Sequence, residues 1–193
     1  MSRTLSHLLK NLLASQEAIE APEEGSTQEI EYTVWGKLKD PEQLKQAERW
    51  ESQEQWDLRN DKGDTVRVRC VNDEHYRLCV KYSVKGQDGR VETEYPIDKD
   101  IFESIKMIAT AGMRKKRYFF PIENGLVWEV DLFEGDWLKL DLEVKAFDGD
   151  PPAYPIDVID PIIDIPGSLN EQEKAKLKEH IETNIVLKNP NRS

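Results

Sequence analysis

The sequence predicts an α+β fold in which about eight antiparallel strands form a closed or nearly closed β-barrel (a tunnel) with flanking helices. Between residues 28 and 148, eight short segments alternate polar with apolar residues, and turn sequences such as Glu123–Gly125 and Glu134–Asp136 separate several of them. Alternation with a period of two is typical of strands, and short turns join antiparallel neighbours. Many short strands favour closure because closure removes unpaired edges.

Each expected element has its own signal. The expected strands cover residues 29–35, 55–60, 65–71, 76–85, 90–95, 114–122, 125–133 and 138–147. Residues 39–54 have the polarity of a helix, with Asp40 at the cap position and Pro41 in the first turn. Residues 98–111 place isoleucines on one helical face, which predicts a second helix.

The chain divides into three expected parts. Residues 1–27 predict an amphipathic helix and an acidic linker, because five leucines between Leu5 and Leu13 recur at helical spacing. This apolar stripe either packs on its own domain or docks to a protein partner or a second copy. Residues 28–148 carry the strands. In residues 149–193, prolines exclude regular structure before Ser168, where a capping-box sequence starts a helix to about Leu187.

Composition limits the class of protein. The formal net charge of −11 over 193 residues argues against general binding to duplex nucleic acid. No apolar run approaches the roughly 20 residues that span a bilayer, so we expect no membrane association. Cys70 and Cys79 form neither a disulfide framework nor a metal-ligand spacing. The start of the sequence does not have the pattern of a secretory signal. We therefore expect a cytoplasmic protein.

Charged residues occur two apart along the expected strands, so that both members of a pair point to one face. The pairs are Glu29 and Glu31, Arg67 and Arg69, Glu92 and Glu94, Lys115 and Arg117, and Asp141 and Glu143, with Lys81 alone. Such charges can be enclosed only if they meet opposite charges, water, metal or an ionic ligand. Residues 62–117 hold 13 Lys/Arg against 9 Asp/Glu, whereas the chain as a whole is acidic. Converging cations and carboxylates indicate a site for a polyanion held with a divalent metal; the alternative is an ordinary solvated surface.

The order of these motifs resembles the CYTH superfamily, also called triphosphate tunnel metalloenzymes, over roughly residues 28–148. This resemblance implies an eight-stranded antiparallel tunnel that binds a triphosphate. It also implies roles for individual residues. Glu29, Glu31, Asp141 and Glu143 would hold Mg²⁺ or Mn²⁺, with Glu29, Glu31 and Glu143 as catalytic residues. Arg67, Arg69, Lys81, Lys115 and Arg117 would bind phosphate oxygens, and Glu92, Glu94 and Asp131 would complete an acidic wall.

Two positions depart from the family pattern. The opening motif of the family is Glu-x-Glu-x-Lys, and this chain has Thr33 at the lysine position. Asp141 stands where the family usually has glutamate, which shortens one metal ligand by a methylene. The lysine of the family faces the bound phosphates, so its replacement favours binding over turnover.

Several functions fit this sequence. The first is metal-dependent hydrolysis of inorganic tripolyphosphate or of a nucleoside or RNA 5′-triphosphate. The second is a binding module that sequesters or senses a nucleotide or polyphosphate without cutting it. A class IV adenylate cyclase is a variant of the first, and an interaction protein that keeps only the scaffold is a further alternative. The expected partner is a triphosphate-bearing small molecule or an RNA 5′ end.

Overall fold

A computed structural model describes residues 30–59, 65–83, 90–144, 152–164 and 168–189 of the chain. The expected leucine-rich N-terminal helix and Glu29 lie outside the described residues. Within the described part of the chain, no helix is both long enough and apolar enough to cross a membrane.

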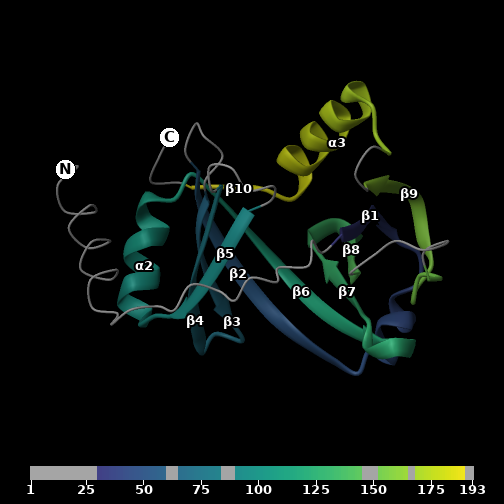
Figure 1. The fold of residues 1–193 in the computed structure, drawn as a ribbon, viewed down its shortest axis with the longest axis horizontal. Coiled ribbons are helices and arrows are strands. Elements are labelled where there is room, and N and C mark those ends of the chain that lie inside the picture. Colours follow the sequence, from purple (N-terminus) through teal and green to yellow (C-terminus); the bar gives the residue numbers. More distant parts are fainter. Residues whose placement is uncertain (1–29, 60–64, 84–89, 145–151, 165–167, 190–193) are drawn as a thin grey trace.

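One antiparallel sheet of ten strands forms the centre of the described structure (Figure 1). Its strand order is β5-β4-β3-β2-β6-β7-β8-β1-β9, and β10 pairs with β6. The strands are β1 (Ile30–Leu38), β2 (Arg49–Arg59), β3 (Thr65–Val71), β4 (His75–Ser83), β5 (Arg90–Pro96), β6 (Ala111–Pro121), β7 (Val127–Leu132), β8 (Trp137–Val144), β9 (Val158–Asp164) and β10 (Leu187–Lys188). The helices are α2 (Lys99–Ile108), α3 (Glu171–Asn184) and the short 3-10 turns η1 (Pro41–Gln46), η2 (Glu123–Gly125) and η3 (Glu134–Asp136).

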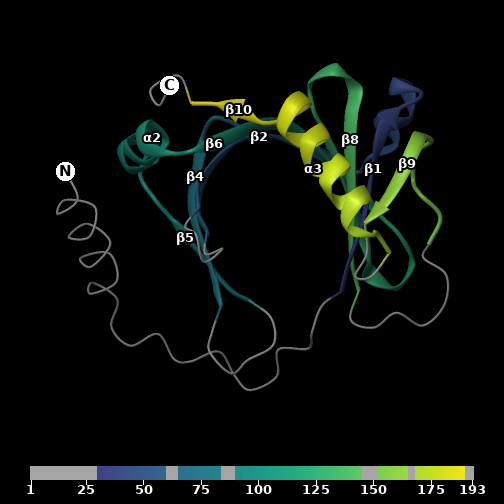
Figure 2. The same ribbon diagram turned by 90° about the horizontal axis from the view of Figure 1, so that it is seen from above.

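The prediction of an α+β antiparallel fold with flanking helices is confirmed, but the expected closed or nearly closed barrel of eight strands is not confirmed. The sheet has ten strands in the described residues, and its edge strands β5 and β9 are not paired with each other there. Figure 2 shows the sheet curled into an open arc, with α2 outside the arc and α3 across one of its ends. The curvature still gives the sheet a concave face, which the closed tunnel would have provided.

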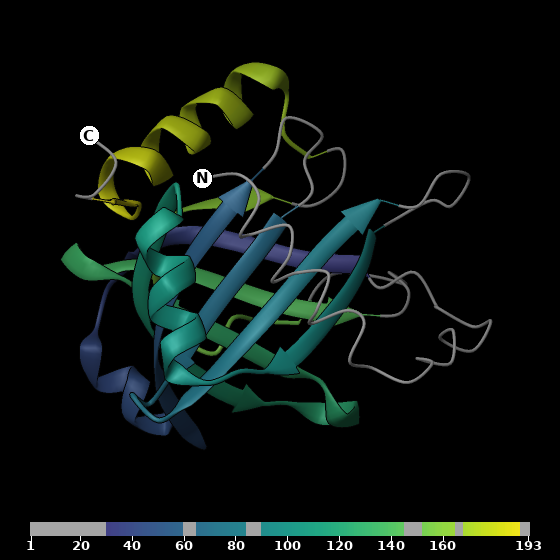
Figure 3. The ribbon, with the colours of Figure 1, turned by 90° about the vertical axis from the view of Figure 1, so that its left-hand side faces the viewer.

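Apolar side chains lie on the convex face, in two separate clusters. One cluster is centred on Trp128, Leu138 and Leu140, all 0% exposed, and covers the half of the sheet formed by β1, β8 and β7. In the other, α2 lies across β2, β3 and β4 (Figure 3), and its Phe102 packs among residues such as Trp56 and Val68. Burial of apolar surface on this face is the dominant favourable term in folding, which leaves the concave face available for charge.

Strand β2 corrects the expected helix at residues 39–54. Helical structure is limited to η1, where Asp40 caps by accepting a hydrogen bond from the backbone N–H of Glu42 at 3.0 Å, and β2 already begins at Arg49. Strand β2 pairs with β3 on one side and with β6 on the other. This pairing outweighs the local helical polarity, because the preference of a segment for a strand depends strongly on its tertiary context.

The segment after residue 149 contains a strand that the prolines seemed to exclude. Strand β9 includes Pro161 and pairs with β1, with a register shift between Trp35 and Lys37. Proline is tolerated here because β9 is an edge strand with a bulge, where a missing N–H costs little. Helix α3 is confirmed, but its capping box is formed by Asn170 and Glu173 and not by Ser168.

Gly112 provides a test of the packing on the convex face. A Cβ atom at this position would lie 2.5 Å from the indole Cε3 of Trp56. We expect Gly112→Ala to lower the free energy of unfolding by about 1–3 kcal/mol, the usual cost of overpacking, in urea denaturation. In a Trp56→Leu background, the same substitution should cost clearly less, because the indole is absent. Equal costs in both backgrounds would contradict this account of the glycine.

Candidate functional site

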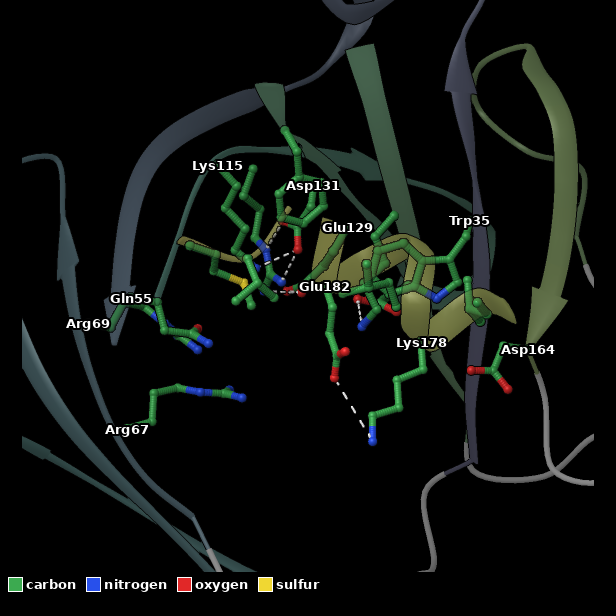
Figure 4. A pocket seen from close by; sticks show the side chains of 18 of the residues that line it. Trp35, Gln55, Arg67, Arg69, Lys115, Glu129, Asp131, Asp164, Lys178 and Glu182 are labelled. Carbon is green, nitrogen blue, oxygen red and sulfur yellow. Dashed lines mark hydrogen bonds and ion pairs between the residues drawn. The ribbon is translucent and has the colours of Figure 1, made fainter. Parts of the chain in front are cut away.

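The concave face encloses a cavity of about 800 Å³ (Figure 4). Most strands of the sheet contribute a side chain to this cavity. Helix α3, which lies across one open end of the curled sheet, contributes side chains as well. Its described cations are Arg67, Arg69, Lys81, Lys115, Arg117, Lys139, Lys174 and Lys178, and its described carboxylates are Glu94, Glu129, Asp131, Asp141, Asp164 and Glu182. Eight cations face six carboxylates, so the described wall has an excess of positive charge.

All five predicted phosphate-binding residues line this cavity. Arg67 and Arg69 come from β3, Lys81 from the neighbouring β4, and Lys115 and Arg117 from β6. Strand alternation explains why the members of each pair share a face. Their roles in binding remain predictions.

Asp131 is the centre of the most buried charge cluster. Its carboxylate accepts hydrogen bonds from Lys115 Nζ at 2.5 Å and from Arg117 Nε and Nη2 at 2.7 and 2.9 Å. Arg117 Nη1 also pairs with Glu129. The side chain of Asp131 is 1% exposed and that of Lys115 is 6% exposed. The cluster joins β6 to β7 across the concave face, where Arg117 and Asp131 are direct cross-strand partners.

The ionisation of this cluster is unequal. Burial opposes the charge of Asp131, but the hydrogen bond from Arg117 and the charges of Lys115 and Arg117 lower its pKa to about 2. Burial lowers the pKa of Lys115 to about 8, and the charges of Arg117 and Arg69 act in the same direction, although Asp131 opposes them. The carboxylate of Asp131 therefore pairs with two cations, and the charge of Lys115 is stabilised less than that of Arg117.

The two arginines of β3, Arg67 and Arg69, have fewer or longer contacts with carboxylates than Lys115 and Arg117 have. Arg67 Nε lies 3.2 Å from Asp57 Oδ1. Arg69 Nη1 lies 3.5 Å from Glu94, which also pairs with Arg77, and the buried Nε of Arg69 has no hydrogen-bond partner among the described residues. Burial first, and then the charges of Arg67 and Arg117, lower the pKa of Arg69. This part of the wall is where an added anion would gain most.

Thr33, at the position where the resembled sequence motif has lysine, forms a hydrogen bond with Asp141. Thr33 Oγ1 donates to Asp141 Oδ1 at 2.8 Å, and Lys139 Nζ lies 2.6 Å from Asp141 Oδ2. Lys139 lies two residues before Asp141 on β8 and also lines the cavity. An ammonium group is therefore present beside Asp141, but it comes from β8 and not from β1.

The predicted metal ligands are only partly described. Positions 31 and 143 are direct cross-strand partners on β1 and β8, next to the pair formed by positions 33 and 141. Asp141 is buried at the cavity wall. In the part of the chain that the structure describes, no group of three His, Cys, Asp or Glu side chains lies close enough to hold a metal ion. Of the predicted acidic wall, Glu94 and Asp131 line the cavity, and for Glu92 the structure gives only the pairing of its backbone with Lys81.

Sequence reasoning missed several residues of the cavity. Gln55 lies in the expected strand over residues 55–60 and was missed because it carries no charge, whereas the pattern used was one of charged pairs. Glu129 and Lys139 were missed although each stands two residues before an assigned acid, so the same alternation could have found them. Trp35 and Phe133 stack with ring centroids 6.2 Å apart at the same wall.

Helix α3 also supplies part of the wall, which no sequence pattern indicated. Leu177 and Ile181 of α3 add apolar surface, as does Val186 after the end of the helix, and Lys174, Lys178 and Glu182 of α3 add charge. Lys178 Nζ lies 3.9 Å from Glu182 (Figure 4). The ring of His180 meets that of Trp137 with centroids 3.8 Å apart, which fixes α3 to the start of β8.

The Asp131 cluster makes a stability prediction. We expect Asp131→Asn to lower the free energy of unfolding by about 3–5 kcal/mol, because it leaves Lys115 and Arg117 buried without their carboxylate. The loss, measured by chemical denaturation, should be at least as large at pH 5 as at pH 7, because Asp131 is ionised at both pH values and its removal lowers the pKa of the buried Lys115 further.

Glu129→Gln is the control for this experiment. Glu129 pairs with the same arginine, but its side chain is 36% exposed. We expect a loss of under about 1 kcal/mol. A loss for Asp131→Asn as small as that of the control would show that the buried cluster does not stabilise the fold.

Known proteins provide comparisons of structure. No protein-family model and no curated protein matches the chain. A putative adenylyl cyclase from Hippeastrum, HpAC1, described as having a dominant triphosphatase activity, has a TM-score of 0.45 and 14% identity, over 81% of this chain and 87% of its own. The inorganic triphosphatase NE1496 has a TM-score of 0.41 and 21% identity, over 65% and 81%. The PH1819 protein from Pyrococcus horikoshii OT3 has a TM-score of 0.41 and 18% identity, over 84% and 94%.

Proposed function

We propose that this chain binds a triphosphate-bearing molecule in the cavity and hydrolyses its phosphoanhydride bond with the help of a divalent cation. The observation that supports this most strongly is the convergence of Arg67, Arg69, Lys81, Lys115 and Arg117 on one cavity, whose cations outnumber its carboxylates among the residues that the structure describes. A triphosphate carries about four negative charges, and an arginine fork recognises phosphate oxygens in a bidentate manner. The cavity volume of about 800 Å³ is in the range of small-molecule sites.

The carboxylates of Glu29, Glu31, Asp141 and Glu143 are proposed to hold the cation. Their oxygen-only chemistry suits Mg²⁺ or Mn²⁺, and the register of β1 and β8 places positions 31 and 143 opposite each other. A bound divalent cation would neutralise charge on the phosphates and lower the pKa of an attacking water.

The side chains of the protein then have distinct tasks. Arg67 and Arg69 hold and orient phosphate oxygens, which is the main requirement of phosphoryl transfer. Thr33 and Lys139 hold the carboxylate of Asp141 in place through bonds of 2.8 and 2.6 Å. Lys139 also places a positive charge beside the carboxylates, which partly replaces the lysine that position 33 lacks.

A second candidate function is binding without turnover. Both carboxylate oxygens of Asp141 already contact Thr33 or Lys139, so a cation would have to share them. This observation favours a module that holds a polyanion through its cations alone. Its signature is tight binding with no product.

One experiment separates these functions. Isothermal titration with tripolyphosphate and with ATP, with and without Mg²⁺ or Mn²⁺, measures binding, and the same samples are assayed for phosphate and pyrophosphate. Metal-dependent release of phosphate supports the triphosphatase, and release of pyrophosphate from ATP indicates a cyclase. Binding without product indicates the binding module. Absence of binding would contradict the proposal and leave only the scaffold function.

The metal assignment makes its own prediction. We expect the double substitution Glu29→Gln and Glu31→Gln to reduce metal-dependent hydrolysis by at least about a hundredfold. The substitution removes the negative charge of two proposed metal ligands and changes the side-chain volume little. Circular dichroism should show an unchanged fold. Normal hydrolysis by the folded double variant would refute the assignment of these residues.

The low pKa of Lys115 predicts a pH dependence of binding. As the pH rises through about 8, Lys115 loses its proton, and the affinity for tripolyphosphate should fall by up to about tenfold between pH 7 and pH 9. Ionisation of tripolyphosphate itself changes the affinity in the opposite direction, because the ligand gains negative charge as the pH rises. Titration calorimetry across this range measures the effect.

Lys115→Arg is the matched variant, because arginine keeps its charge at these pH values. Its affinity should not fall over the same range. A fall of the same size in both proteins would show that Lys115 is not the titrating group.

A further inference from the structure

We propose that Asp57 is a positioning residue for anion binding: its carboxylate fixes the guanidinium of Arg67 through Nε, so that the other edge of the guanidinium faces a phosphate in the cavity. This inference rests on the proposed function, since it concerns the binding of a triphosphate. The sequence motifs gave no indication of a contact between Asp57 and Arg67.

The contact is buried and precisely placed by the sheet. Asp57 is 2% exposed, and its Oδ1 accepts hydrogen bonds from Arg67 Nε at 3.2 Å and from Gln55 Nε2 at 3.3 Å. Asp57 and Arg67 are direct cross-strand partners on β2 and β3. The side chain of Arg67 is 23% exposed and extends into the cavity (Figure 4).

The backbone of Asp57 is held from the other side. Its carbonyl oxygen accepts hydrogen bonds from both the N–H and the Oγ1 of Thr110, each at 2.9 Å. On β6, Ala111 is its cross-strand partner. A carboxylate supported on both sides by regular structure can hold a neighbouring side chain in one orientation.

Comparison with Arg117 shows which N–H groups of Arg67 this orientation leaves available for a ligand. Arg117 uses Nε and Nη2 for Asp131 and Nη1 for Glu129, so its whole guanidinium is engaged within the protein. The contact of Arg67 with Asp57 uses Nε. The Nη1–Nη2 edge of Arg67 therefore points away from Asp57 and can give two parallel hydrogen bonds to a phosphate.

The sign of a mutational effect distinguishes positioning from simple charge. If Asp57 acted only through its negative charge, its removal would strengthen the binding of a polyanion. If Asp57 acts by orienting Arg67, its removal must weaken binding, because the guanidinium loses its fixed geometry. The two accounts predict changes in opposite directions.

The test is a double-mutant cycle on the full chain, with the Kd for inorganic tripolyphosphate measured by titration calorimetry. We expect Asp57→Asn to weaken binding about tenfold, the lower end of the loss seen when a group that orients a ligating side chain is removed. In an Arg67→Ala background, Asp57→Asn should change the Kd by less than about twofold, because its effect passes through Arg67. Asp100→Asn, which removes an exposed carboxylate from α2, is the charge-matched control and should leave the Kd unchanged.

Each result decides the inference. Tighter binding by Asp57→Asn, or an equal loss in both backgrounds, overturns it while leaving the proposed function intact. Absence of binding by the wild-type protein overturns both. If Asp57→Asn does not fold, Arg67→Lys is the deciding variant, because lysine keeps the positive charge but has no guanidinium group. Binding of tripolyphosphate as tight as that of the wild type would overturn the inference. A loss of affinity close to that of Arg67→Ala would support it.

Discussion

The ion cluster around Asp131 is the interaction on which the concave face depends. Lys115 and Arg117 bring two cations into a nearly closed space, and charges in such a place are costly unless they are paired. Asp131, at 1% exposure, provides that pairing from the neighbouring strand. Because one carboxylate pairs with two cations, this cluster is stabilised and still has one positive charge in excess.

The fold places burial and charge on opposite faces of one sheet. The convex face is covered by α2 and by the segments that pack on Trp128 and Leu140, so it provides the apolar core. The concave face can then carry polar residues such as Gln55 and Asp57, which would weaken an ordinary core. Strand alternation makes this separation automatic, since successive side chains point to opposite faces.

The charged cavity divides into two kinds of cation. Lys115, Arg117 and Lys139 are closely bound to Asp131 or Asp141, whereas Arg67 and Arg69 have longer or fewer carboxylate contacts. If the proposed anion binds to the second kind, the ion pairs of the first kind need not be broken. Thr33 and Lys139 both bond to the carboxylate of Asp141, from β1 and β8 respectively.

The sequence by itself determined the eight central strands and the common face of their charge pairs, because a period of two is a local property of the chain. Helices α2 and α3 also followed from local signals. Tertiary structure decided the rest. The first part of β2, residues 49–54, is a strand because β6 and β3 pair with a segment that locally favours a helix, and β9 exists because an edge position tolerates Pro161. Whether the sheet closes, which carboxylate meets which cation, and how α3 reaches the cavity depend on contacts between segments far apart in sequence. A local pattern contains no information about these contacts.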